Sequence, residues 1–385
     1  MLFDDFEDED EDDKPAAAIE RRAGLAVPRL SSLCLGHEKV EGDLLTQIEQ
    51  GRVPHAMIFA GTEGIGKATF AYRMARYMLS RGSADTEDAG PGLFGEPLPA
   101  AKVESMSLSV DHPDVRKVAS GAHPDLLTVE RQFDEKRGRF KGALDVEQVR
   151  RIPPFMRMTA AQGGWRVVVV DDADTMTRSA QNAILKVLEE PPPHALLMLI
   201  THRPGLMLPT IRSRSRMVHF EPPTPEIFAR LLRADHPDLA TRDIDTLYAI
   251  AGGSVGQGLR LLAEGGLEAV DKIMGLLHGW PQWDWPQIHM LADVMSRPGQ
   301  DDSLQSFQDV WLWSIDSMLR AKARGQGALP GPLANDAVSR MLGHYSLPQW
   351  MAIRDALHSH FDTANHASLD RRHTVMGTFW AFAAA

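Results

Sequence analysis

Cysteine is almost absent from this sequence, because Cys34 is the only one in 385 residues. A single thiol excludes an internal disulfide framework and a zinc site of the usual four-thiolate kind. No run of 18 or more apolar residues occurs, so no membrane-spanning helix is indicated. The first residues, MLFDDFEDEDEDDKP, are acidic where a secretory signal is basic and then apolar. We therefore expect a cytoplasmic protein with no zinc and no membrane association.

Positive charge is also too scarce to form a basic stripe, since 41 Lys and Arg stand against 52 Asp and Glu. Nine of the acids lie in residues 1–13, where no base occurs, so the formal net charge of −11 falls to −2 for the remainder. Like charges repel, and few apolar residues compensate for ordering them, which predicts an acidic disordered tail over 1–24. The alternative is an acidic arm that binds a partner. Direct DNA binding is not indicated.

Residues 25–222 alternate short apolar runs with helical periodicity, the pattern of a mostly parallel α/β sheet. Buried strands are predicted at 56–61, 166–174 and 195–201. A helix is predicted over 67–80, with Phe70, Met74 and Met78 on one face.

Two segments of this region are predicted to lie outside its regular elements. Residues 81–118 are rich in Gly, Pro, Ser and acids and suggest a surface insertion, whereas 131–142 suggest a second mobile loop. Strand signals stop at 221–225. We expect a small helical lid domain over 223–267 and an all-helical domain over 268–385.

The longer helical region carries seven of the eight tryptophans. Trp311, Trp313, Trp350 and Trp380 recur at helical spacing among Leu, Ile and Met. This spacing favours core packing over a platform on which bases stack.

The stretch GTEGIGKATF, from Gly61 to Phe70, matches the phosphate-binding pattern G-x-x-x-x-G-K-[ST] except at its last position. It lies between a predicted strand and a predicted helix, the context that such a loop requires. Backbone N–H groups around Gly61, Gly64 and Gly66 can face phosphate at a helix N-terminus, and Lys67 adds a mobile cation. The alternative is a glycine turn without a ligand.

Ala68 replaces the hydroxyl that ligates Mg²⁺ in this class of site. Thr69 does not simply substitute for it, because the next residue of a helix points about 100° away. Nucleotide binding can survive this loss, but metal-assisted hydrolysis should suffer.

VVVVDDAD, residues 167–174, ends a predicted strand with acids. Asp171 stands where such sites hold the Mg²⁺ shell, and Asp172 stands where ATPases prefer the longer Glu to orient water. The alternative is that Asp171 to Asp174 cap the following helix.

The segment DADTMTRSAQNAILKVLEEPPPHALLMLIT, followed by LPTIRSRSR, resembles the clamp-loader branch of the AAA+ proteins. LGHEKVEGDLLTQIEQGRVPHAMIFAGTEGIGKAT, GAHPDLLTVER and GGWRVVVVDDADTM resemble the delta-prime subunits of bacterial DNA polymerase III. The resemblance covers about residues 30–262, and the rest matches only in its helical character. It implies an AAA+ P-loop domain, a helical lid and an all-α collar for oligomerisation.

The resemblance also assigns three positions. Arg214, in Ser213-Arg214-Ser215, matches the arginine that reaches into the nucleotide site of a neighbouring subunit, and the alternative is a structural ion pair. Thr201 matches the first sensor residue near the γ-phosphate. Gly256, in GGSVGQGLRLL, falls where motor subunits carry a lid arginine.

Ala68, Asp172 and Gly256 together predict a loop that holds ATP or ADP with Mg²⁺ weakly and hydrolyses it slowly or not at all. The resemblance implies a non-motor clamp-loader subunit in a hetero-pentamer with gamma/tau and delta subunits. It would act on the sliding clamp and primed DNA through the assembly. The first alternative is an ATP-hydrolysing gamma/tau-type motor subunit, and the second is a stand-alone P-loop enzyme such as a small-molecule kinase. Polymerase chemistry is not expected in this chain.

Overall fold

The computed structural model describes residues 27–84, 103–134, 139–325, 329–367 and 370–383. The predicted acidic tail over 1–24 and much of the predicted insertion over 81–118 therefore lie outside the described residues. The chain divides into two compact units, with the division between Ile227 and Phe228.

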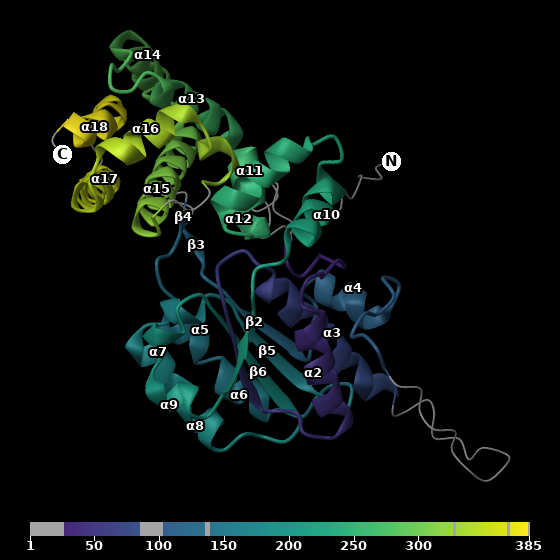
Figure 1. Ribbon diagram of the computed structural model, residues 1–385. Coiled ribbons are helices and arrows are strands. Elements are labelled where there is room, and N and C mark those ends of the chain that lie inside the picture. The colour runs from purple at the N-terminus through teal and green to yellow at the C-terminus, as the bar shows by residue number, and fades with distance from the viewer. Residues whose placement is uncertain (1–26, 85–102, 135–138, 326–328, 368–369, 384–385) are drawn as a thin grey trace, which may run out of the picture. The chain divides into compact units, whose positions relative to one another are not determined.

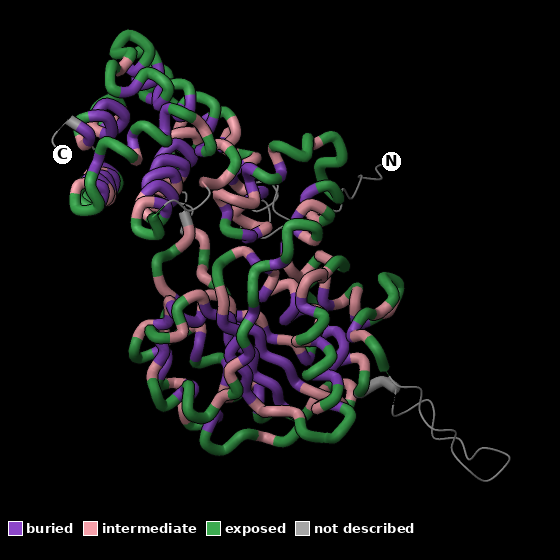
Figure 2. The backbone as a smooth tube through the Cα atoms, viewed as in Figure 1, coloured by how far each residue is buried: buried purple, intermediate pink, exposed green. Residues whose placement is uncertain are grey.

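The first unit is built on a parallel five-stranded sheet with the order β2-β5-β6-β1-β7 (Figure 1). The strands are β1 Ala56–Ala60, β2 Leu126–Val129, β5 Arg166–Val170, β6 Ala195–Thr201 and β7 Arg216–His219. All residues of β1, β5 and β6 are buried, which explains their unbroken apolar runs (Figure 2). The predicted parallel α/β fold is confirmed.

Helices cover both faces of this sheet, and alternate residues of β1 point to opposite faces. Met57 and Phe59 pack with α2 (Glu38–Glu49) and α3 (Lys67–Ala84). Ile58 packs on the other face, among the helices that follow β4, β5 and β6. Those helices are α5 Val146–Val149, α6 Ile152–Arg157, α7 Arg178–Ala183, α8 Leu185–Glu189 and α9 Pro209–Arg212. Phe70, Met74 and Met78 lie on the buried face of α3, as predicted.

The prediction of a loop over 131–142 was incomplete. Two short antiparallel strands pair there, β3 (Phe133–Asp134) and β4 (Arg139–Phe140), and the Phe133 and Phe140 rings meet edge to face. Strands of two residues are too short for a periodicity signal. Three further short elements complete the unit, α4 Pro113–Ala119, η1 Ala173–Thr175 and η2 Pro204–Leu206.

The described part of the second unit is helical and contains no strand, as predicted. Helix α10, Pro225–Asp235, crosses the division between the units. The others are α11 Thr241–Ala251, α12 Val255–Ala263, α13 Gly266–His278, α14 Trp285–Met295, α15 Asp301–Ala323, η3 Gly331–Leu333, α16 Asp336–His344, α17 Leu347–Ala367 and α18 Arg371–Ala383. The separation of a lid over 223–267 from a collar over 268–385 stays a prediction. Within the described ranges, no helix combines the length and apolar character needed to cross a bilayer.

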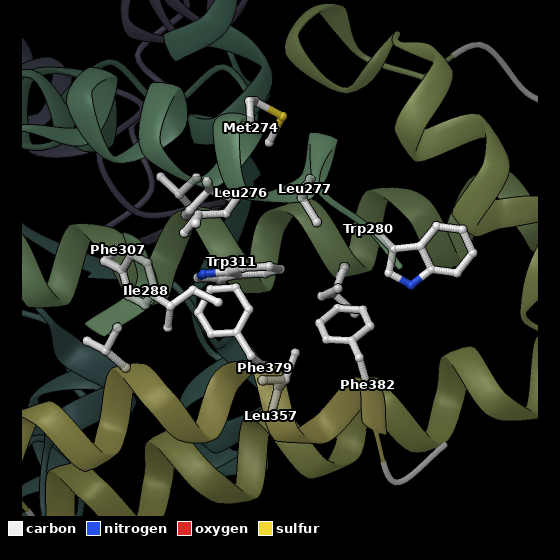
Figure 3. Packing of buried hydrophobic residues seen from close by; sticks show 14 of the residues in the cluster. Met274, Leu276, Leu277, Trp280, Ile288, Phe307, Trp311, Leu357, Phe379 and Phe382 are labelled. Atoms are coloured by element: carbon white, nitrogen blue, oxygen red, sulfur yellow. The ribbon is translucent and has the colours of Figure 1, made fainter. Parts of the chain in front are cut away.

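Trp311 of α15 lies in the buried hydrophobic cluster of this unit. Figure 3 shows its ring between side chains of α13, such as Leu276, and Phe379 of α18. Its ring centroid is 5.5 Å from that of Phe379. Trp350 is equally buried, and Trp313 is partly buried with its indole N–H donated to the Ala249 carbonyl. Trp380 is 47% exposed, so the prediction of core packing was wrong for this residue.

Candidate nucleotide-binding site

The glycine loop joins the end of β1 to the start of α3 at Lys67, as predicted. Gly64 and Gly66 adopt φ angles of 72° and 98°, which residues with a side chain rarely adopt. A Cβ on Gly61 would lie 2.5 Å from the Phe220 carbonyl oxygen. The backbone therefore requires glycine at all three positions, and its shape suits a phosphate group at a helix N-terminus.

His37 contacts this loop through a hydrogen bond, although the sequence analysis did not identify it as a site residue. It precedes α2, is buried, and places Nε2 2.7 Å from the Ile65 carbonyl oxygen. Its ring meets those of Phe70 and Phe220 edge to face. Burial lowers the pKa of His37, so the neutral ring donates to the carbonyl and holds the loop.

Lys67 directs its ammonium group at groups within the protein. Nζ lies 2.9 Å from the Gly61 carbonyl oxygen, 2.5 Å from that of Thr62 and 3.0 Å from Nδ1 of His202. The side chain is buried, and desolvation lowers its pKa to about 8 despite the nearby carboxylates. The lysine is in the predicted place, but its donors are engaged.

Asp172 follows β5 in a left-handed conformation, with φ of 50°. Its Oδ1 lies 2.8 Å from Nε2 of His202, and its Oδ2 lies 2.6 Å from Nε of Arg131. Burial alone would raise the pKa of Asp172, but the bond from His202 and the charge of Arg131 lower it. The same bond raises the pKa of His202.

Asp171 lies beside this cluster and is partly buried. Its Oδ1 accepts a bond from the backbone N–H of Asp172 at 2.9 Å. Loss of hydration, followed by repulsion from the Asp172 carboxylate, raises the pKa of Asp171 to about 6. The raised pKa means that the folded chain disfavours a negative charge on this carboxyl group.

Thr201 is fully buried at the end of β6, close to Asp174. Its Oγ1 accepts from the backbone N–H of Arg203 at 3.1 Å. Asp174 in turn accepts from the backbone N–H of His202 and from Nε of Arg203, each at 3.2 Å. These bonds fix the turn after β6, and with it the position of His202.

The alternative that these acids cap the next helix is not what the described residues show. Asp172 precedes the short helix η1 but makes no side-chain capping bond. The hydroxyl of Thr177 caps α7 instead, by accepting from the backbone N–H of Ala180 at 3.2 Å.

The side chains at this edge of the sheet do not fit a magnesium nucleotide in the arrangement observed. Ala68 offers no hydroxyl and packs partly against the core, and Thr69 is half-buried one position further along α3. The ammonium group of Lys67 and both carboxylate oxygens of Asp172 are hydrogen-bonded to protein groups. The loop thus has the backbone of a phosphate site, whereas the side chains around it are bonded to one another. Among the described residues, no group of three His, Cys, Asp or Glu side chains could hold a metal ion.

Arg214 lies elsewhere in the first unit, directly after α9. Its guanidinium is 38% exposed, forms an ion pair with Glu189 at 3.2 Å, and donates to the Thr210 carbonyl oxygen at 3.1 Å. Glu189 is itself 51% exposed. Gly256 belongs to α12 of the second unit.

The parallel sheet and the glycine loop between β1 and α3 together form the architecture of a P-loop protein. Over residues 101–224 the chain matches the family described as "DNA polymerase III, delta subunit". It is 34% identical over 229 residues to the subunit delta' of DNA polymerase III from Pseudomonas aeruginosa, a match that covers 57% of this chain and 61% of that protein. The corresponding Escherichia coli K12 subunit is 27% identical over 243 residues, or 63% of this chain and 65% of that protein. The resemblance to the delta-prime subunits of DNA polymerase III is therefore confirmed.

The matches span less than two thirds of the length of either curated relative. The tau subunit of DNA polymerase III from Salmonella typhimurium is also similar, at 25% identity over 65% of this chain and 36% of that protein. A solved structure from Thermotoga maritima, described as a DNA polymerase III gamma subunit-related protein, covers 88% of this chain and 98% of its own at 16% identity and a TM-score of 0.35. A structural likeness at this level supports no argument about function.

Proposed function

We propose that this chain is a non-motor subunit of a DNA polymerase III clamp loader, acting in the cytoplasm during replication. It would assemble with gamma/tau and delta subunits into a hetero-pentamer that loads the sliding clamp on primed DNA. Arg214 would complete the ATP site of a neighbouring motor subunit. The similarity to delta-prime subunits supports the assignment to the clamp loader, and the geometry of the first unit supports the absence of a motor.

One observation carries the non-motor assignment, namely that both carboxylate oxygens of Asp172 are already bonded. A water-orienting acid needs a free oxygen within hydrogen-bond reach of the water that it positions. Here one oxygen faces His202 and the other faces Arg131, two groups that stabilise its negative charge. A carboxylate held in this way is a poor base, and two of its roughly four acceptor positions are already occupied by protein donors.

The surroundings of Arg214 support the second half of the proposal. Its ion pair with Glu189 joins two exposed side chains, and such pairs contribute only about 0–1 kcal/mol. The guanidinium can therefore leave Glu189 at little cost when a phosphate of a neighbouring subunit approaches. A planar cation that is always charged is suited to stabilising the charge that develops on a transferred phosphoryl group.

The test is clamp- and primer-stimulated ATP turnover by the reconstituted loader, with Arg214→Ala and Glu189→Gln compared against the wild-type chain. An arginine finger contributes about 10³-fold or more at its own site, so Arg214→Ala should visibly lower total turnover and clamp loading in an assembled complex. Glu189→Gln breaks the same ion pair and keeps the arginine, so it should leave turnover intact or raise it.

The two variants separate a finger from a structural ion pair. Equal losses in Arg214→Ala and Glu189→Gln would mean that the pair itself matters and that no finger is donated. Unchanged turnover in both would remove the mechanism while leaving the subunit assignment in place. The alternative of a motor subunit is supported by the similarity to a tau subunit. It predicts ATP hydrolysis by the isolated chain.

A further inference from the structure

His202 stands between the phosphate-binding lysine and the acid at the end of the neighbouring strand. An ammonium group has three N–H donors and accepts nothing. On Lys67 these three face the carbonyl oxygens of Gly61 and Thr62 and the Nδ1 atom of His202. All three donors of the ammonium group are therefore directed at the protein.

The opposite side of the imidazole explains why Nδ1 can accept. An ionised carboxylate only accepts hydrogen bonds, so Nε2 of His202 carries the proton that is donated to Oδ1 of Asp172 at 2.8 Å. The Lys67 ammonium group can only donate, so Nδ1, which lies 3.0 Å from Nζ, accepts and is the unprotonated nitrogen. Arg131 holds the other oxygen of Asp172 and thereby fixes the carboxylate that sets this tautomer.

The loop itself would admit a phosphate group, because its glycines adopt the required backbone and α3 offers its N-terminus. What the loop lacks is a lysine free to reach that group. The residues form a chain of contacts, Lys67 to His202 to Asp172 to Arg131, which links the glycine loop to the segment after β2.

We propose that His202 is the residue that decides whether this loop takes a nucleotide, because its imidazole holds Lys67 against the loop carbonyls. Removing the imidazole frees one donor of Lys67 and opens the space beside it, so the loop gains affinity for a nucleoside diphosphate. This inference rests on the proposed non-motor function, since it explains how a P-loop is kept from acting as a nucleotide site. It concerns binding alone, and Ala68 still leaves the metal without its hydroxyl ligand.

The size of the effect follows from the bonds exchanged. One hydrogen bond to a charged group corresponds to about a tenfold change in affinity or more. We therefore expect His202→Ala to bind ADP about tenfold more tightly than the wild-type chain, or more.

The experiment is titration calorimetry of ADP into the full-length chain, carried out with and without Mg²⁺. His202→Ala is compared with wild type, and His202→Asn provides a second variant whose shorter polar side chain does not span from Asp172 to Lys67. The backbone N–H of His202, which is bonded to Asp174, is kept in both. His219→Ala is the matched control, because His219 is exposed on β7 and makes no hydrogen bond to Lys67 among the described residues.

The gain must also depend on Lys67, so His202→Ala is combined with Lys67→Ala. Tighter ADP binding in His202→Ala that disappears in the double variant supports the inference. Wild-type affinity in correctly folded His202→Ala and His202→Asn overturns it, and so does a gain that persists without Lys67. Tight ADP binding by the wild-type chain overturns it as well.

The outcome is separable from that of the proposed function. The clamp-loader proposal fails through the Arg214 and Glu189 comparison or through hydrolysis by the isolated chain. The inference about His202 fails through ADP affinity alone.

Discussion

The carboxyl edge of the sheet and the core of the second unit bury their side chains in opposite ways. At the edge, the side chains that are buried or half-buried are the charged or polar groups of Lys67, Asp172 and His202. Each of them is hydrogen-bonded to another group of the protein. In the core, Trp311 and its neighbours are removed from water as apolar rings in edge-to-face contact (Figure 3). The comparison teaches that the core of the second unit contributes to the free energy of unfolding. The edge of the sheet instead keeps polar and charged groups whose burial lowers stability, and it holds them in a fixed arrangement.

The largest effect is expected in the core. Trp311→Ala removes a fully buried indole and leaves a cavity among Phe307, Phe379 and Phe382, so unfolding free energy should fall by about 3–5 kcal/mol. Urea denaturation followed by circular dichroism measures this loss. A decrease in unfolding free energy below about 1 kcal/mol would contradict this expectation, because the core around Trp311 would then not be a main source of stability.

Trp311→Phe serves as the matched variant for this measurement. The indole Nε1 of Trp311 is buried and has no hydrogen-bond partner among the described residues. A phenyl ring keeps much of the packing and removes that unpaired donor, so the two effects partly offset each other. Its loss of stability should be well below that of Trp311→Ala.

The next effect has the opposite sign and lies at the sheet edge. Asp171→Asn should stabilise the chain at pH 7 by about 1–2 kcal/mol, because it removes a carboxylate that is poorly hydrated and close to Asp172. The folded pKa of about 6 lies above the ordinary value of 3.8, so the folded state binds the proton more tightly. Stability due to this group therefore falls as pH rises from about 4 to 6, and the cost is complete at neutral pH.

Denaturation of both proteins at pH 7 and near pH 3.5 checks the sign. The advantage of Asp171→Asn should vanish at the lower pH, where the wild-type carboxyl is protonated in both folded and unfolded states. An advantage of the same size at both pH values would show that charge is not its cause.

The smallest effect is expected for a tryptophan on the surface. Trp380 is 47% exposed and meets the ring of His373 at its edge, with 5.3 Å between the centroids. Trp380→Ser should change the free energy of unfolding by only about 0.5 kcal/mol. Paired with Trp311→Ala in the same denaturation series, it separates burial from residue type. A loss comparable to that of Trp311→Ala would contradict the exposure assigned to Trp380.

Local patterns were sufficient to predict much of the fold. The continuous apolar runs of β1, β5 and β6 indicated central strands buried on both faces, and the glycine spacing predicted the loop at the end of β1. Strands β2 and β7 were missed because each has only four residues, which is too short for a clear apolar run or alternation. The exposed position of Trp380 was missed because helical spacing among apolar residues does not say which face of a helix is covered.

The candidate site was predicted only in part, for a related reason. Lys67 was predicted from the phosphate-binding pattern and Asp171 and Asp172 from their place at the end of a predicted strand, whereas Thr201 was assigned by the family resemblance. His202 follows Thr201 directly, yet nothing in its local pattern reveals that its ring lies between Lys67 and Asp172. Arg131 and His37 act from segments 41 and 28 residues away from their partners along the chain.

The sequence by itself determined the parallel α/β fold and its glycine loop, since apolar periodicity and glycine spacing act through neighbouring residues. It also determined which chemical groups the site lacks, because Ala68 has no hydroxyl in any fold. The tertiary structure alone decided what the remaining groups do. Hydrogen bonds of charged side chains depend on distances between strand ends that are remote in sequence, and these distances exist only once the sheet has formed.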